Sequence, residues 1–232
     1  MLKDLVEKVG GRFSVGLGID LSSRHPEKIF KWFFASVLFG ARISEIIVIK
    51  TYKEFDRNGI ITPEGILNVG WDGLVKILDR GGYVRYDFKT ATKLLDLSAM
   101  LKDRYDCDLN VLHSKASQPR DLEMRLKGLA KGIGEVTVNI FLREMRGIWE
   151  KAEPFASELA ITAARCIGIL PSYHNDREKL LTYLKRKWMV EGMKVGNFPD
   201  FEAALVRLGK DYCRKALCDK CPIKCECKGI KK

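Results

Sequence analysis

The sequence predicts an all-α protein, and three observations agree on this. Apolar residues recur at three- and four-residue spacing along most of the 232 residues, while the alternation typical of half-buried strands is scarce. Hydrophobic residues make up 46% of the chain, enough to bury a sizeable core in one large or two small domains. Turn residues such as Gly40 and the pair Gly81-Gly82 separate the helical segments.

The first half of the chain contains five expected helices. Proline in the first turn marks the start of the first, and threonine is a favoured N-cap for the third. The amphipathic pattern of the last is the most regular. The expected helices are 26–38, 44–52, a short one capped by Thr62, one from Trp71 to Gly81, and 87–105.

The second half is expected to begin with a polar loop at 114–120. Two helices then flank a glycine-containing turn, and three more precede a group of cysteines. These helices are expected at 121–129, 134–146, 157–169, 176–194 and 200–210.

The charge of the chain favours a polyanionic partner. Lys and Arg number 41 against 30 Asp and Glu, which gives a formal net charge of +11. No apolar run approaches the roughly 18 to 20 residues of a membrane span, and the charged N-terminal segment is unlike a signal peptide. We therefore expect a soluble, cytoplasmic protein without a membrane partner.

A Gly-x-Gly sequence lies between two of the helical patterns, at Gly132-Ile133-Gly134. Glycines allow the backbone to come close to a ligand, and the following helix begins with unpaired amides at its positive dipole end. A DNA phosphate fits there, with Lys127 and Lys131 adding charge. In isolation the same sequence is more often a simple helix-helix turn.

Five of the seven cysteines lie in the last twenty residues. Four thiolates around one centre suit zinc or a four-iron cluster, and a C-x2-C pair is a usual part of such sites. Disulfides are not expected in a cytosolic protein of this kind. The five are Cys213, Cys218, Cys221, Cys225 and Cys227.

From about residue 26 to the C-terminus the chain resembles the helix-hairpin-helix base-excision DNA glycosylases, in particular the endonuclease III and adenine-glycosylase families. Their hairpin usually reads Leu-Pro-Gly-(Ile/Val)-Gly followed by Thr-Ala; this chain has Ala130-Lys131 for Leu-Pro but keeps Gly132-Ile133-Gly134 and Thr137. The resemblance implies a two-lobed architecture, with lobes at 27–145 and at 1–26 plus 146–232, and double-stranded DNA lying across the cleft.

The resemblance also implies a 4Fe-4S cluster, with zinc as the alternative. The related proteins end in C-x6-C-x2-C-x5-C, and Cys213, Cys218, Cys221 and Cys227 give C-x4-C-x2-C-x5-C. Only the first of these spacings differs from the family pattern, and Cys225 remains an alternative to Cys227 as the fourth ligand. The expected task of the cluster is to order a small basic loop against the DNA backbone.

Catalytic residues depart further from the family pattern. The families carry an Asp about twenty residues after the second hairpin glycine, where this chain has Pro154 and Ser157. Glu158 is therefore the candidate catalytic carboxylate, and Glu153 is the alternative. The carboxylate would stabilise an oxocarbenium-like state of the sugar or activate water. Val136 stands where lyase-competent members have lysine, so no β-lyase activity of that type is expected.

Two positions concern the gap left by a flipped base. Arg42 follows the first long helix and is expected to fill that gap or to bind phosphate. The resembling families insert a second side chain into the duplex as a wedge. Here the expected wedge residue is Tyr83 or Arg85, after the turn at Gly81-Gly82. The leading functional hypothesis is a monofunctional glycosylase that removes a damaged base, and the alternative is a glycosylase-like protein that binds DNA or lesions without catalysis.

Overall fold

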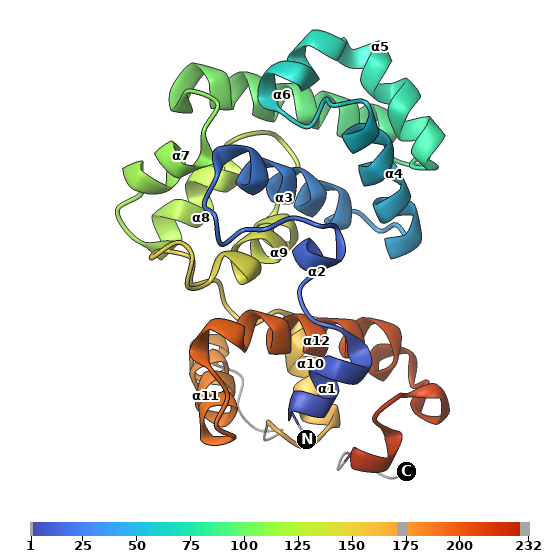
Figure 1. Cartoon of the computed structure of the whole chain (residues 1–232), viewed down its shortest axis with the longest axis vertical. Helices are drawn as coiled ribbons and strands as arrows, with labels where there is room; N and C mark the ends of the chain where they lie inside the picture. The colour runs from blue at the N-terminus through green and yellow to red at the C-terminus, as the bar shows by residue number, and fades with distance from the viewer. Residues whose placement is uncertain (1, 171–175, 228–232) are drawn as a thin grey trace. The chain divides into compact units, whose positions relative to one another are not determined.

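The computed structural model of the chain describes residues 2–170 and 176–227, and it divides into two compact units (Figure 1). One unit is Leu17–Glu153; the other is Met1–Gly16 together with Pro154–Lys232. Helices are the regular elements of the described residues, which confirms the all-α expectation. The division falls after residues 16 and 153, not at the expected 26 and 145. Buried side chains at Ile19, Leu21 and Trp149 explain why the flanking segments pack with the first unit.

The unit Leu17–Glu153 contains seven helices among its residues, all of which the structure describes. Six start within two residues of the expected positions, and α6 matches the expected helix at both ends. The seven are α3 (Pro26–Phe39), α4 (Glu45–Arg57), α5 (Pro63–Gly81), α6 (Asp87–Tyr105), α7 (Leu109–Lys115), α8 (Pro119–Lys127) and α9 (Glu135–Met145).

The core of this unit is centred on α3, whose side chains Trp32, Phe33 and Phe34 are completely buried. Trp32 donates a hydrogen bond from Nε1 to the Phe141 carbonyl on α9, at 3.1 Å. Phe33 meets Phe141 edge-on with ring centroids 5.0 Å apart. These contacts hold α9, and with it the end of the glycine-containing turn, against the centre of the unit.

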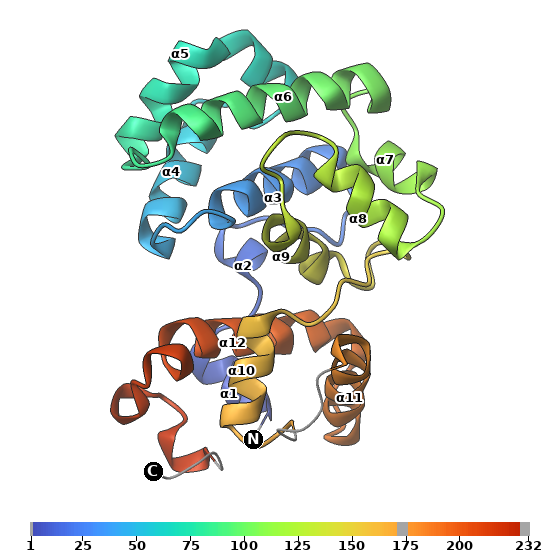
Figure 2. The same ribbon diagram turned by 180° about the vertical axis from the view of Figure 1, so that it is seen from behind.

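The helix α5 is kinked at Gly70, which has φ 68° and ψ 176°. Thr62 caps its start by accepting a hydrogen bond from the Gly65 amide at 3.0 Å. The two expected helices, one capped by Thr62 and one from Trp71, are therefore the two arms of this element. The kink allows α5 to lie along α6, as Figures 1 and 2 both show.

A short helix, α7, occupies residues that the sequence pattern left unassigned. Asp108 caps it by accepting a hydrogen bond from the Asn110 amide at 2.7 Å. Because α7 continues to Lys115 and α8 begins at Pro119, the loop expected at 114–120 is limited to 116–118. The expectation of a longer loop was wrong because capping by Asp108 and the burial of Leu109 and Leu112 stabilise a helix of about two turns.

The second unit is built around α12 (Phe198–Asp211). Gly209 allows close packing on α10, since a Cβ at this position would collide with the Leu159 carbonyl. Trp188 stacks on Phe201 with centroids 5.0 Å apart and so fixes α11. The other described elements are α1 (Leu2–Val9), α2 (Phe13–Gly16), α10 (Glu158–Cys166), α11 (Arg177–Val190), η1 (Val195–Asn197), η2 (Cys213–Lys215), η3 (Cys218–Lys220) and η4 (Lys224–Glu226).

None of the described helices combines the length and the apolar character that crossing a membrane requires.

Candidate nucleic-acid interface and thiol cluster

The glycine-containing turn joins α8 to α9 and spans residues 128–134 (Figure 2). Ile133 points inward and is 4% exposed, while Gly132 and Gly134 on either side of it are exposed. Gly132 has φ +89°, a conformation that side chains with a Cβ rarely adopt. The inward isoleucine thus anchors the turn and leaves the backbone of its two glycines facing outward.

Gly134 is the N-cap of α9 and has an extended conformation, with φ −102° and ψ −175°. It supplies no side-chain oxygen to the first amides of α9, and a Cβ built on it would have no heavy atom within 4 Å. An external acceptor can therefore approach these amides closely. This is the geometry in which a helix N-terminus binds an anion.

Three lysines belong to this turn or contact it. Lys131 is exposed in the turn and Lys127 is half-buried at the end of α8. The third, Lys93 on α6, was not identified from the sequence: its Cε lies 3.1 Å from the position of a Cβ on Gly132. Burial lowers the pKa of Lys93 from its usual value. No spacing rule indicates this contact, because Lys93 lies 39 positions before Gly132 along the chain.

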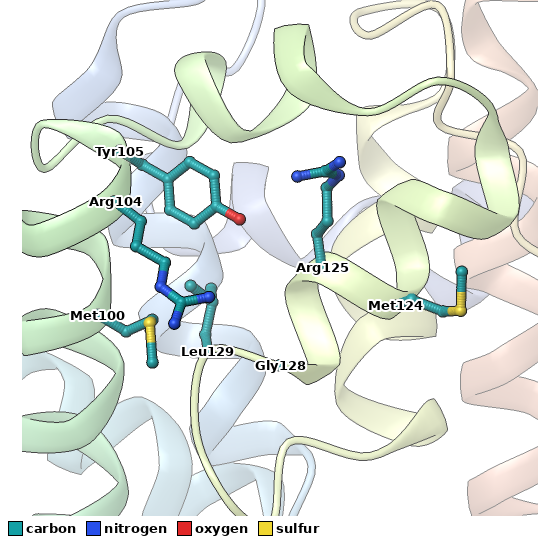
Figure 3. Close-up of a pocket in the computed structure, with 7 residues that line it drawn as sticks. All are labelled: Met100, Arg104, Tyr105, Met124, Arg125, Gly128 and Leu129. Carbon is teal, nitrogen blue, oxygen red and sulfur yellow. The ribbon is translucent and has the colours of Figure 1, made fainter.

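A pocket of about 270 Å³ adjoins the start of the turn, between α6 and α8 (Figure 3). The guanidinium groups of Arg104 and Arg125 and the hydroxyl of Tyr105 all face this pocket. Arg125 is neutralised in part by Asp121, with Nε 3.1 Å from a carboxylate oxygen. Arg104 Nε lies 3.9 Å from an Asp103 carboxylate oxygen, so both arginines of the pocket have an acidic partner.

The expectation that Tyr83 could be inserted into DNA was wrong. Its ring is 0% exposed and its hydroxyl donates a hydrogen bond to the Leu38 carbonyl at 2.7 Å. Tyr83 therefore ties the connection after α5 to the end of α3. Arg85, the alternative at this wedge, is exposed and lies over the Tyr86 ring at 5.4 Å, and Arg42 is exposed after α3. Both arginines are accessible to a ligand.

Glu158 is the first residue of α10 and belongs to the second unit. Its side chain is 76% exposed, and its carboxylate lies 3.4 Å from Nη2 of Arg177. Ser157, at the N-cap, accepts a hydrogen bond from the Ala160 amide at 3.3 Å. The start of α10 is thus organised around the serine cap, with Glu158 directed toward solvent and a guanidinium.

Glu153, the reserve carboxylate, belongs to the same unit as the turn. It accepts a hydrogen bond from the nearly buried Arg146 at 3.0 Å. It also lines a polar hollow with His113 and Trp149, whose rings are stacked with centroids 4.7 Å apart. Val136 is exposed in the first turn of α9, at the position where a lysine would be needed for lyase chemistry.

The terminal cysteines lie in the second unit after α12. Cys213, Cys221 and Cys227 are partly buried, whereas Cys218 and Cys225 are exposed. Burial first, and then the neighbouring thiols of Cys166, Cys221 and Cys227, raise the pKa of Cys213 to about 12. Burial also raises the pKa of Cys221, and the nearby thiols of Cys227 and Cys218 raise it further.

A thiol from outside the terminal loop joins this group. Cys166 ends α10, and its carbonyl accepts a hydrogen bond from the Cys227 thiol at 3.4 Å. Sequence reasoning missed this residue because it is 47 positions before Cys213 and belongs to no spaced motif.

Thiolate donors are the kind that zinc and iron–sulfur clusters take, so the chemistry of this group fits either centre. Within residues 2–170 and 176–227, however, no three Cys, His, Asp or Glu side chains form a preassembled metal site. Metal binding would therefore have to draw the thiols closer together, which is usual for short cysteine loops.

Comparisons with known proteins leave the family of the chain undecided. No protein-family model matches it, and no curated protein is similar to it in sequence.

Proposed function

We propose that this chain binds the backbone of double-stranded DNA through the turn 128–134 and acts on that DNA as a monofunctional base-excision glycosylase. The observation that carries the proposal is the open approach to the start of α9, where Gly134 leaves the first amides without a capping side chain. Backbone amides and the helix dipole bind phosphate without reading bases. Such a contact suits an enzyme that must inspect DNA of any sequence.

Positive charge around the turn supports the same ligand. Lys131 is exposed in the turn, Lys93 contacts it, and Arg104 faces the adjoining pocket. The net charge of +11 adds a long-range attraction to polyanions. Arg42 and Arg85 are further exposed cations of the same unit, proposed to contact the duplex or the gap left by an extruded base.

The proposed reaction is hydrolysis of the bond between the sugar and a damaged base. Glu158 is the proposed carboxylate: ionised, it would stabilise positive charge on the sugar or orient the attacking water. Its carboxylate lies 3.4 Å from the guanidinium of Arg177. Because Val136 stands in place of an amine, the reaction would stop at the abasic site without strand cleavage.

The terminal thiols are proposed to hold a 4Fe-4S cluster, with zinc as the alternative metal. Cys213, Cys221 and Cys227 are the three predicted ligands that are shielded from solvent. When bound, the metal would order the basic segment 213–227 by linking thiolates distant in the chain. No redox step is part of the proposal.

A second candidate function is DNA or lesion binding without catalysis. The observation that favours it is the setting of Glu158, which is largely exposed and paired with Arg177 rather than enclosed in a pocket. Ser157, where the resembling families carry their Asp, serves as a helix cap.

A single-turnover incubation distinguishes the two candidates. The metal-loaded protein is incubated with duplexes that carry uracil, hypoxanthine, an oxidised pyrimidine, 8-oxoguanine or an alkylated purine, and strand breaks are scored before and after hot alkali. The glycosylase proposal expects breaks on at least one duplex only after alkali. It also expects Glu158→Gln to slow that reaction by roughly a hundredfold or more, the scale of a lost acid–base group.

Glu178→Gln is the matched control, because Glu178 is an exposed glutamate in the first turn of the neighbouring helix α11. It should leave the rate unchanged. Tight binding with no breaks on any duplex would favour the non-catalytic candidate, and breaks before alkali would contradict the assignment of Val136.

A further inference from the structure

The end of α10 lies against the terminal cysteine loop. Cys166 is the last residue of α10, and the Cys227 thiol donates a hydrogen bond to its carbonyl at 3.4 Å. Cys213 begins η2, and η2 packs against α10. The segments that carry Cys166, Cys213 and Cys227 therefore lie side by side in the fold.

Exposure divides the six cysteines of this unit into two groups. Cys166, Cys213, Cys221 and Cys227 are partly buried, and Cys218 and Cys225 are exposed. Cys221 belongs with the first group by its exposure, whereas Cys218, three positions earlier, does not. Four partly buried thiols are the number that a tetrahedral zinc ion or a four-iron cluster requires.

We propose that Cys166 is a metal ligand, and that the centre is held by the thiolates of Cys166, Cys213, Cys221 and Cys227. This ligand set replaces Cys218 of the terminal spacing pattern and leaves Cys225 outside the centre. The inference rests on the metal centre of the proposed function but not on DNA binding or catalysis. On binding, each thiol gives its proton to solvent as its sulfur–metal bond forms, with no change of oxidation state.

The position of Cys166 on a packed helix gives this ligand a particular role. Gly209 brings α12 into backbone contact with α10, so the end of α10 is fixed within the unit. The loop that carries the other three thiols consists of single 3-10 turns with few buried residues. A ligand on α10 would therefore anchor the metal to the folded unit, while the three loop ligands close around it.

Metal content of serine variants tests the ligand set directly. The full chain is purified without oxygen from iron- and zinc-replete cells, and iron, acid-labile sulfide and zinc are measured per chain. Cys166→Ser should lose most of the metal that the unchanged protein contains, whereas Cys218→Ser and Cys225→Ser should retain it. Cys107→Ser is the control from the other unit. Retention by the Cys166 variant together with loss by the Cys218 variant would overturn the proposal.

Alkylation of the unchanged protein covers the case in which the Cys166 variant does not fold. The metal-loaded chain is treated with iodoacetamide under native conditions, and labelled cysteines are located by peptide mass spectrometry before and after removal of the metal. Cys166, Cys213, Cys221 and Cys227 should be protected until the metal is removed, and Cys218 and Cys225 should be labelled throughout. Early labelling of Cys166 would contradict its role as a ligand. Purified protein that contains neither iron nor zinc would refute the centre itself, whatever the outcome with DNA.

Discussion

Gly132 and Gly134 lie two residues apart in one turn but are needed for different physical reasons. Gly132 has φ +89°, and a Cβ there would press on the Lys93 side chain at 3.1 Å. Gly134 has a φ that any residue can adopt, and a Cβ there would meet open space. The first glycine is required by the fold, and the second only by whatever must approach the start of α9.

Alanine substitution should separate these two requirements. Gly132→Ala should lower the free energy of unfolding by about 1 to 2 kcal/mol, the cost of placing a Cβ in a left-handed conformation. Gly134→Ala should change it by no more than about 0.5 kcal/mol. Urea unfolding is followed by tryptophan fluorescence in a Trp188→Phe background, because Trp32, Trp71 and Trp149 all belong to the unit Leu17–Glu153. Equal losses from both variants would contradict the assignment.

Individual residues also differ in whether their role in the candidate site could be predicted from the sequence. The turn at the Gly-x-Gly sequence could be predicted because its requirements are local. The burial of Tyr83 could not, because it depends on a hydrogen bond to Leu38, forty-five residues earlier. Lys93 and Cys166 were missed for the same reason: each is brought to its neighbours by helix packing and by no spacing in the chain.

At the scale of elements, α9 begins without a side-chain cap, as α3, α6 and α8 do, but its N-cap residue is a glycine. The N-cap side chains of Ser44, Thr62 and Ser157 each accept a hydrogen bond from the helix that they start. Gly134 cannot do so, and the space beside it leaves the start of α9 open to an external acceptor. A phosphate oxygen can accept these hydrogen bonds, and one charge-assisted bond is worth about 1.5 to 3 kcal/mol.

A bulky side chain at Gly134 should therefore block DNA binding without unfolding the protein. Gly134→Leu is expected to weaken binding by about tenfold or more on every duplex, since about 1.4 kcal/mol corresponds to a factor of ten. Fluorescence anisotropy with unrelated duplex sequences gives the measurement. Gly196→Leu is the matched control, because Gly196 also has open space around a Cβ and an unrestricted φ. A loss confined to one sequence would point to base reading, and no loss would exclude the turn from the interface.

The helices themselves were predictable to the extent that their signals are local. The α6 boundaries follow from its amphipathic pattern, and the kink in α5 follows from the separate start signals at Thr62 and Trp71. The helix α7 was not predicted, because its seven residues are too few to show a helical periodicity of apolar residues. The division of the chain after residues 16 and 153 depends on long-range packing of segments such as the one that carries Trp149.

At the scale of the whole molecule, the charge of +11 allows two explanations of DNA binding. A diffuse positive charge would attract any polyanion, and removal of any exposed cation would weaken binding alike. A defined phosphate site would depend on the cations at that site. Lys131 in the turn and Lys53 on α4 are both exposed lysines of the same unit, so their alanine variants have the same net charge.

The salt dependence of binding distinguishes these explanations. The logarithm of the association constant should fall linearly with the logarithm of salt concentration, with a slope of about −0.9 per phosphate contacted. Lys131→Ala should reduce the size of that slope by about one and weaken binding equally on all sequences. Lys53→Ala should leave the slope unchanged if the turn is the site. Equal reductions in both variants would mean that the positive charge of the molecule acts as a whole, since a contact that neutralises a particular phosphate cannot be replaced by charge elsewhere.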